Sequence, residues 1–403
     1  MRIAIAKPDF GVVGGFEKVL SRVEHELLSS GHTVDWLCVD MEATSPAPYG
    51  VAVPHSLRLR MPAFVRYLAA VEAFQRIDAS AHDLLVSTQP PSFAVDHRRH
   101  LSLFYHHQRL YYDLSDAWIA AGFADAGLHG HAAALVRRVD QRHLSRVGLF
   151  LAASEVVRER LRHYNGCEEN IGVFLAGAGL HEALLGAGGE RSWDHVLCVT
   201  RHEFPKRAEL FVHAMAYLPG VRGRVVGSGG RLGFAIDLAR RLTTPGVDLD
   251  AVTDAELWLN RGVLGNGGNG GNGAGPPPPS VGNLAFLGQV SDAELGRLYA
   301  GALCVVAPAY LEDYGLTVIE AMAAGKPVVV CSDGGGLCLP VEDGVNGFVV
   351  EPTGRAVAEA VARLREQPDL ARQMGERGRE TAAEYTWERA MRQFMDGVTR
   401  LCG

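Results

Sequence analysis

The chain of 403 residues is too long for one ordinary hydrophobic core and predicts two or three domains. Its 47% hydrophobic and 21% charged residues are typical of a soluble globular protein. Its formal net charge of −7 at pH 7 argues against a nucleic-acid-binding protein, which would need a basic surplus.

The cysteines and the hydropathy of the chain indicate a cytoplasmic protein. The seven cysteines form no Cys-x-x-Cys pair, so we expect reduced thiols and no metal cage. The N-terminus has too short an apolar run for a secretory signal. No segment reaches the roughly 18 apolar residues that a membrane span needs.

Short apolar runs alternate with helical patterns along the chain. We predict buried parallel strands at residues 3–6, 34–39, 84–87, 101–105 and 149–153. A second series is predicted at residues 196–200, 224–227, 284–287, 302–307, 328–331 and 347–350. This alternation predicts an α/β fold of two doubly wound, Rossmann-like domains, with ligands bound at the carboxyl ends of the strands, facing a cleft between the domains.

The boundary between the two domains is predicted near residues 186–193, which are small and polar. The N-terminal domain would then cover residues 1–188 and the C-terminal domain residues 189–385. A helix at residues 386–403 would cross back to the N-terminal domain. Residues 266–279 read NGGNGGNGAGPPPP and are expected to form a disordered loop, because they cannot bury apolar surface.

The most informative segment is residues 312–329, which read EDYGLTVIEAMAAGKPVV. Glu312 follows a predicted strand, and Glu320 lies in a helix that we expect to start near Leu316 or Thr317. Such a strand–loop–helix junction directs backbone N–H groups at one point, which suits a phosphate. A carboxylate on each side suits vicinal hydroxyls, so the segment predicts a site for a nucleotide sugar. The alternative is a helix with one solvated and one structural glutamate.

This segment closely resembles the signature of family 4 retaining glycosyltransferases, in which two glutamates flank seven residues and the fold is GT-B. The resemblance implies transfer of a sugar from a nucleotide-diphosphate sugar to an acceptor hydroxyl, with retention and without a metal or cofactor. Glu312 would hold hydroxyls of the donor sugar, and Glu320 those of the ribose. The backbone around four further residues would contact phosphate and sugar: Tyr314, Gly315, Leu316 and Thr317.

Arg201 and Lys206 follow the first predicted strand of the second domain. Lysine is rare in this chain, which has only four. The two cations resemble the pair that holds the donor diphosphate in this family, where they would stabilise charge on the leaving group. The alternative is a solvated basic loop.

Three further residues resemble the family's nucleotide-binding turns. Gly227 ends the next strand in a Gly-Ser-Gly turn, and Gly288 and Val290 lie in the segment whose backbone would contact the base. A plain structural turn is an equally good interpretation of Gly227.

In the N-terminal domain, Gly14 and Gly15 open a helix after the first strand, which would let backbone approach a phosphate or acceptor. The strand at residues 101–105 runs into His106 and His107. His107 lies where related enzymes place a histidine near the transferred sugar. If the alignment is shifted by one residue, His106 takes that position instead. The acceptor side would be lined by Arg109, Tyr112 and Asp113.

Two features depart from the resemblance. Leu339 stands where relatives carry a glutamate, so any donor contact from that side chain is lost, although backbone contacts from residues 334–337 would survive. Residues 243–282 form an insertion, and we interpret its Asp248 and Asp250 as incidental rather than as a metal-binding Asp-x-Asp.

The expected partners are the nucleotide sugar and a hydroxyl acceptor: a saccharide, a lipid-linked saccharide or a secondary metabolite. The basic amphipathic residues 57–77 favour a helix with one buried face over contact with the inner membrane surface. Two alternative functions stay open. One is a GT-B epimerase or hydrolase, whose extra carboxylate pair we do not find, and the other is a non-catalytic nucleotide-sugar-binding protein.

Overall fold

The computed structural model describes residues 1–11, 14–177, 193–257 and 280–402. The chain divides into two compact units, the first formed by Met1–Ala176 with Trp387–Gly403 and the second by Gly177–Thr386. The predicted boundary at 186–193 and the tract at 266–279 lie almost wholly outside the described residues.

Unit 1 contains a six-stranded, wholly parallel sheet in the order β2-β1-β3-β4-β5-β6. Its strands are β1 (Arg2–Asp9), β2 (Thr33–Asp40), β3 (Leu84–Ser87), β4 (His100–Phe104), β5 (Leu149–Ala152) and β6 (Ile171–Val173). Five of them match the predicted apolar runs. The sequence did not predict β6, because three half-buried residues at a sheet edge carry too little pattern.

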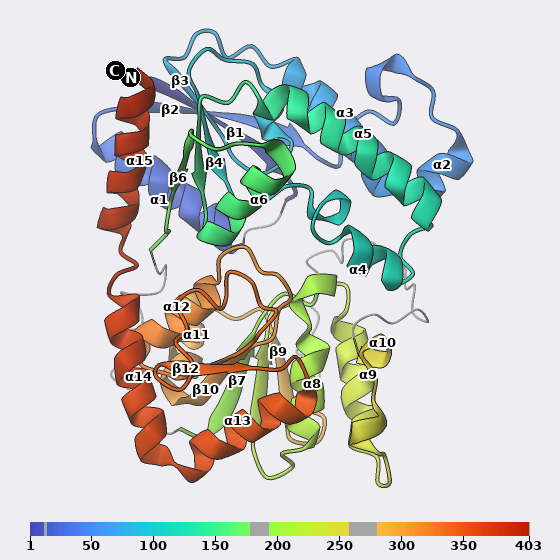
Figure 1. Cartoon of the computed structure of the whole chain (residues 1–403), viewed down its shortest axis with the longest axis vertical. Coiled ribbons are helices and arrows are strands. Elements are labelled where there is room, and N and C mark those ends of the chain that lie inside the picture. The colour runs from blue at the N-terminus through green and yellow to red at the C-terminus, as the bar shows by residue number, and fades with distance from the viewer. Residues whose placement is uncertain (12–13, 178–192, 258–279, 403) are drawn as a thin grey trace. The chain divides into compact units, whose positions relative to one another are not determined.

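The helices of unit 1 are α1 (Gly15–Ser29), α2 (His55–Arg60), α3 (Pro62–Gln75), α4 (Ser115–Ala120), α5 (Ala126–Leu144), α6 (Glu155–Asn165) and α15 (Trp387–Cys402). Figure 1 shows these helices, which either lie against this sheet or pack on other helices of the unit, as α2 does on α3 and α4 on α5. Within α3, Val65, Val71 and Phe74 are buried in the core, so this segment has the buried face that its pattern predicts. The C-terminal α15 packs on the sheet, where a Cβ at Gly397 would lie 3.1 Å from Leu149 Cδ2.

Unit 2 contains a second six-stranded parallel sheet, in the order β12-β11-β10-β7-β8-β9. Its strands are β7 (His195–Val199), β8 (Gly223–Val226), β9 (Leu284–Gly288), β10 (Ala302–Ala307), β11 (Val328–Cys331) and β12 (Gly347–Val350). The helices are α8 (Ala208–Ala216), α9 (Leu232–Leu242), α10 (Asp254–Leu257), α11 (Asp292–Gly301), α12 (Leu316–Ala323), α13 (Gly354–Glu366) and α14 (Pro368–Ala382). The prediction of two doubly wound α/β domains is confirmed.

The strand order of unit 2 determines where a site can form. From β7 the chain moves to β8 on one side, and from β10 it moves to β11 on the other side. At the carboxyl edge of the sheet, the loops after β7 and β10 therefore run in opposite directions. This is the topological switch point, where ligands bind in such sheets. Both strands are almost fully buried, so the ends of their loops are held on a rigid support.

Candidate functional site

The loop after β7 carries the two predicted cations of unit 2. Arg201 is exposed, whereas Lys206 ends the short 3₁₀ turn Phe204–Lys206 and is half-buried. The Lys206 Nζ forms an ion pair with Glu312 Oε2, and less than 20% of the surface of each side chain is exposed. The structure thus brings together two residues 106 positions apart that the sequence assigned to the same ligand.

Arg207 clamps the loop of Lys206 to the loops after β10 and β11. Its guanidinium donates two hydrogen bonds to the carboxylate of Asp333, and its Nε donates to the Pro308 carbonyl at 2.7 Å. The side chain is only 2% exposed. A backbone bond from Tyr310 to the carbonyl of Pro205, 2.7 Å, closes the same contact. Arg207 therefore sets the spacing between Lys206 and Glu312.

The glycines after β11 allow the loop of Glu312 to pack directly against their own backbone. The Glu312 N–H donates to the Gly334 carbonyl at 2.9 Å, and Gly336 donates back to Glu312 at 2.7 Å. A Cβ at Gly336 would lie 2.6 Å from the Asp313 carbonyl oxygen, which leaves no room for a side chain. Leu339 is 48% exposed further along this loop.

The predicted helix start is confirmed at Leu316, where α12 begins after Gly315. Gly315 has a φ of +105°, in the region that favours glycine. The amides of Leu316 and Thr317 belong to the first turn, where N–H groups have no carbonyl one turn earlier in the helix. Tyr314 is only 7% exposed, so little of this residue is available to a ligand.

Glu320 lies on α12 and remains partly exposed. The hydroxyl of Tyr299, on the neighbouring α11, donates a hydrogen bond to Glu320 Oε2 at 3.0 Å. Tyr299 itself is fully buried.

Gly227 and Gly288 lie side by side, since the Gly227 N–H donates to the Gly288 carbonyl at 2.8 Å. Gly227 has a φ of +126°, and a Cβ there would lie 1.9 Å from the carbonyl oxygen of Thr200. The glycine is therefore required for packing of the turn against the loop of Arg201. Val290 is half-buried just before α11.

In unit 1, Gly14 and Gly15 stand at the start of α1, as predicted. Glu17 accepts a hydrogen bond from the Gly14 N–H at 2.8 Å, and Lys7 lies 3.7 Å from the same carboxylate. The helix start is thus capped by a carboxylate of its own chain.

The two histidines after β4 have different surroundings. His107 is 1% exposed, stacks on Tyr112 at 4.2 Å and lies 2.7 Å from Asn165 Oδ1 through its Nε2. Burial lowers the pKa of His107 to about 4, so it stays neutral at physiological pH. His106 is partly exposed, and its Nδ1 lies 2.7 Å from the His107 carbonyl.

The three residues predicted to line the acceptor side are tied into the interior of unit 1. Arg109 pairs with Asp113 at 2.6 Å, and both side chains are mostly buried. The hydroxyls of Tyr112 and Tyr67 donate to the two oxygens of Asp140, at 2.8 Å each. Burial raises the pKa of Asp140 to about 7. These contacts hold the segment after β4 against α5.

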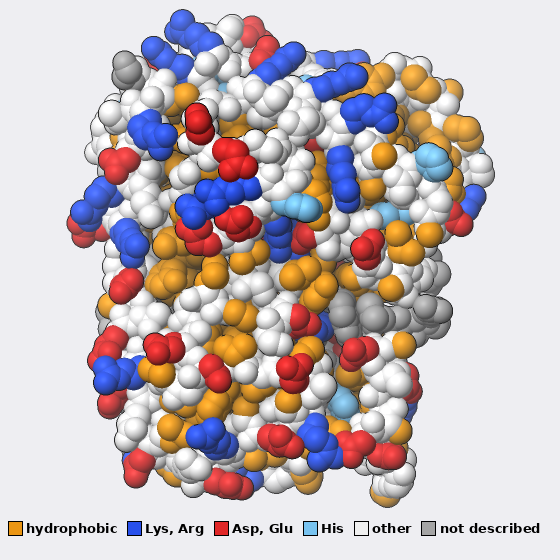
Figure 2. Space-filling model, viewed as in Figure 1, with side chains coloured by type: hydrophobic (Ala, Val, Ile, Leu, Met, Phe, Trp, Pro, Cys, Tyr) orange, Lys and Arg blue, Asp and Glu red, His pale blue; other side chains and the backbone are white. Residues whose placement is uncertain are grey.

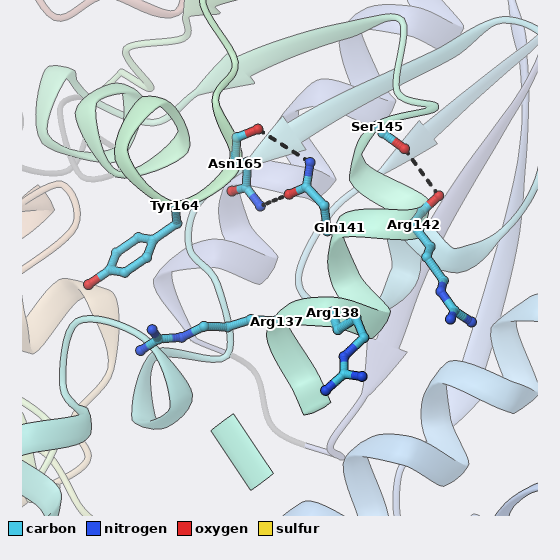
Figure 3. A pocket seen from close by; sticks show the side chains of 7 residues that line it. All are labelled: Arg137, Arg138, Gln141, Arg142, Ser145, Tyr164 and Asn165. Atoms are coloured by element: carbon cyan, nitrogen blue, oxygen red, sulfur yellow. Dashed lines mark hydrogen bonds between the residues drawn. The ribbon is translucent and has the colours of Figure 1, made fainter. Parts of the chain in front are cut away.

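A surface hollow of about 610 Å³ lies on unit 1, and its lining residues Asn165 and Arg137 contact the predicted site residues His107 and Tyr112. Its lining comes from α5 and α6: Arg137, Arg138, Gln141, Arg142, Ser145, Tyr164 and Asn165. Figure 3 shows that the three arginines point in different directions, so they do not converge on one anion. Figure 2 shows basic and hydrophobic side chains mixed over this part of the surface.

Among the described ranges, no group of three or more His, Cys, Asp and Glu side chains could hold a metal ion. Asp250 forms an ion pair with Arg355 and accepts from the Tyr217 hydroxyl at 2.7 Å, while Asp248 caps a turn. The Asp-x-Asp therefore has a structural role. No helix in the described part of the chain is long and apolar enough to cross a membrane.

Solved structures of other proteins share the fold of this chain. The chain aligns over 99% of its length, at 20% identity and a TM-score of 0.68, with 98% of a sucrose-phosphate synthase from Thermosynechococcus elongatus. The Anabaena protein HepE, solved in complex with UDP and glucose, aligns over 99% of both chains at 17% identity and a TM-score of 0.61. The fold is the two-domain GT-B fold.

Sequence similarity concentrates in unit 2. Residues 281–381, from β9 to α14, match the family model "Glycosyl transferases group 1". A D-inositol 3-phosphate glycosyltransferase of Streptomyces griseus is 37% identical over 113 residues, which are 27% of this chain and 23% of that protein. The chain thus spans about a quarter of the length of this relative. The matched family segment contains Glu312, Glu320 and the start of α12.

The pH dependence of stability should report Asp140. The folded protein holds a proton here up to about pH 7, whereas the carboxyl in the unfolded chain releases it near 3.8. The contribution of Asp140 to the free energy of unfolding therefore falls as pH rises from about 4 to about 7. Asp140→Asn should lack that fall. Urea midpoints at pH 5 and pH 8 test this, and an equal pH dependence in both proteins would contradict it. His107 changes the pH dependence of stability in the opposite direction, but it does so equally in the unaltered protein and in Asp140→Asn.

Arg207→Lys should destabilise unit 2 by about 2 kcal/mol, because lysine cannot form the paired hydrogen bonds to Asp333 and also reach Pro308. Chemical denaturation measures the loss. The control is Arg355→Lys, which alters an exposed pair with Asp250 and should cost less than about 1 kcal/mol. Equal effects of the two substitutions would show that Arg207 is not a clamp.

Proposed function

We propose that this protein is a retaining glycosyltransferase that moves a hexosyl group from a nucleotide-diphosphate sugar to an acceptor hydroxyl. The observation that carries the proposal is the juxtaposition of Lys206 and Glu312 at the switch point of unit 2, beside the first turn of α12. A cation and a helix N-terminus suit a diphosphate, and a neighbouring carboxylate suits the sugar attached to it.

In this proposal the donor diphosphate lies between Arg201, Lys206 and the amides of Leu316 and Thr317. Glu312 accepts hydrogen bonds from hydroxyls of the donor sugar. Lys206 and Glu312 form an ion pair with each other. Bound donor would give each of them its own partner, the phosphate for Lys206 and the sugar for Glu312. Their contact thus marks where phosphate and sugar join.

The nucleoside would extend from this point towards Glu320 and the paired glycines. Glu320 would hold the ribose hydroxyls, one turn further along α12 than the phosphate. The backbone of Gly227, Gly288 and Val290 would border the base. Because these contacts are made by backbone, the residues themselves do not select one base.

The reaction would proceed on one face of the sugar through an oxocarbenium-like state. Arg201 and Lys206 would stabilise charge on the departing diphosphate, and a donor phosphate oxygen would take the acceptor proton. We propose no metal and no cofactor, since these cations and the helix dipole would do that work. Of the two histidines, His106 is the better candidate to contact the transferred sugar, because His107 is enclosed by Phe104, Tyr112 and Tyr164.

The acceptor would be a saccharide, a lipid-linked saccharide or a secondary metabolite. Since Arg109, Tyr112 and Asp113 are bound to partners within unit 1, we propose that they shape the segment that carries His106. The similarity to a protein solved with UDP and glucose makes UDP and UDP-glucose the first ligands to try.

Lys206→Ala should lower kcat by on the order of 100-fold, because it removes a cation that acts mainly on the leaving group. The matched control is Arg240→Ala, which removes an exposed cation of the same unit that pairs with Asp237 three residues earlier. Initial rates of donor turnover measure both variants. A kcat of Lys206→Ala equal to that of the control would remove Lys206 from the site.

A screen of nucleotide diphosphates by thermal shift tests donor binding. One of UDP, GDP or ADP should raise the melting temperature of the protein, since a ligand of the native state stabilises it by about RT ln(1 + [L]/Kd). The shift should be lost in a Lys206→Ala protein and kept in Arg240→Ala. No shift with any nucleotide diphosphate or nucleotide sugar would contradict the proposed function.

A further inference from the structure

The surface hollow of unit 1 gathers positive charge that the protein itself leaves unpaired. Three of its lining residues are exposed arginines of α5: Arg137, Arg138 and Arg142. Within the described ranges of the chain, none of the three forms an ion pair with a carboxylate. By contrast, Arg158 and Arg162 on the neighbouring α6 each pair with a glutamate three residues earlier. In a chain with a net charge of −7, such a group of unpaired cations points to an anionic ligand.

The dipole of α5 accounts for only one of these arginines. The helix ends at Leu144, and Arg142 lies in its last turn, where a cation is stabilised by the negative end of the dipole. Arg137 and Arg138 lie about two turns before that end. The effect of the dipole is lost beyond the last turn, so these two cations need another explanation.

The polar floor of the hollow is already ordered. Asn165 Oδ1 lies 2.7 Å from His107 Nε2, and Asn165 Nδ2 donates to Gln141 Oε1 at 2.8 Å. Gln141 Nε2 donates in turn to the Asn165 carbonyl at 3.3 Å, as Figure 3 shows. Each amide nitrogen carries two hydrogens and uses one in these bonds, so one N–H of each side chain remains for a ligand.

Arg137 and Tyr164 are also held in place. The guanidinium carbon of Arg137 lies 5.3 Å from the centre of the Tyr164 ring and 5.3 Å from that of Tyr112. Its Nε donates to the Tyr111 carbonyl at 2.7 Å, which leaves the terminal nitrogens for an anion. Tyr164 is half-buried, so part of it stays open to a ligand.

These groups together suit a chain of sugars that carry acid groups. Guanidinium groups pair with carboxylate or phosphate, amides bind hydroxyls, and an aromatic ring covers an apolar face. Figure 3 shows that the three arginines point in different directions, so the acid groups must be spread along the ligand. Arg138 and Arg142 are separated by about 6 Å along the axis of α5, which fits anions on successive units of a chain.

A membrane surface or a nucleic acid fits the hollow less well. A helix that lies on a bilayer inserts large apolar side chains, and the lining has none besides the Tyr164 ring. A single nucleic-acid strand needs several aromatic rings on which successive bases stack, and the lining has one. The two amides favour a ligand that is rich in hydroxyls.

We propose that the surface hollow of unit 1 binds an anionic glycan, a chain of sugar units that carry carboxylate, sulfate or phosphate groups. The three arginines of α5 pair with acid groups of successive units. Gln141 and Asn165 donate hydrogen bonds to hydroxyls. This binding site goes beyond the proposed function and does not depend on donor binding at Lys206 and Glu312.

Calorimetric titration of the full chain tests the site with two anionic probes, a galacturonic acid tetrasaccharide and a heparin-derived tetrasaccharide. At least one should bind, with an affinity that falls as salt is added, because screening weakens exposed charge pairs. Maltotetraose, which is neutral and of the same length, should bind at least about 10-fold more weakly, the equivalent of one charge-assisted contact.

A double variant, Arg138→Gln with Arg142→Gln, should weaken binding of the anionic tetrasaccharide by at least about 10-fold. Both side chains are exposed and unpaired, so the melting temperature should not change. The matched control is Arg372→Gln with Arg377→Gln, which removes two exposed cations of α14. It changes the net charge equally and should leave the affinity unchanged.

Gln141→Ala separates recognition of a glycan from simple attraction of an anion. The substitution changes no charge but removes a donor for a hydroxyl. It should weaken binding of the anionic tetrasaccharide by about 5-fold, the value of one hydrogen bond between neutral groups. An unchanged affinity would show that the hollow does not recognise hydroxyls and would overturn the inference.

Three further results would overturn the inference. The first is that neither anionic tetrasaccharide binds, or that maltotetraose binds as well. The second is that the double variant of α5 keeps the full affinity, or that the control of α14 loses as much. The third is that phosphatidylglycerol vesicles or oligothymidylate bind more tightly than the tetrasaccharides and are lost in the same double variant, which would assign the hollow to a membrane or a nucleic acid.

Discussion

The ion pair between Lys206 and Glu312 is the contact on which the proposed site depends. It joins a loop after β7 to a loop after β10, and these loops leave the sheet in opposite directions. An all-parallel sheet places every strand end of this kind on one edge, so opposite charges from distant parts of the chain can meet there. Arg207, buried between the same loops, holds the distance between them.

Glycine makes this arrangement possible at the places where backbone must touch backbone. A side chain at Gly227 would collide with Thr200, and one at Gly336 would collide with the loop of Glu312. Gly315 adopts a left-handed conformation directly before α12, which allows the helix to begin at Leu316 immediately after the loop of Glu312. The buried apolar strands hold the ends of the loops in place, and the glycines allow the backbones of neighbouring loops to lie in contact.

The fold was predictable because buried parallel strands are continuous apolar runs, and eleven of them stand out between helical patterns. Glu312, Glu320 and the start of α12 were predictable for a local reason, since one strand–loop–helix junction contains all three. The contacts of Arg207 and Tyr299 were not, because each reaches a partner more than 20 positions away and no local pattern marks it. Nothing in the pair of adjacent histidines distinguishes the buried His107 from the partly exposed His106.

The most direct test of the central claim is the anomeric configuration of the product, followed by NMR while the protein turns over a nucleotide sugar in the presence of acceptor mixtures. The sugar should leave with the configuration it had in the donor, in a product or in slow donor hydrolysis. An inverted product would contradict the retaining reaction at Lys206 and Glu312. A donor that binds tightly but never turns over would contradict catalysis and leave a nucleotide-sugar-binding protein.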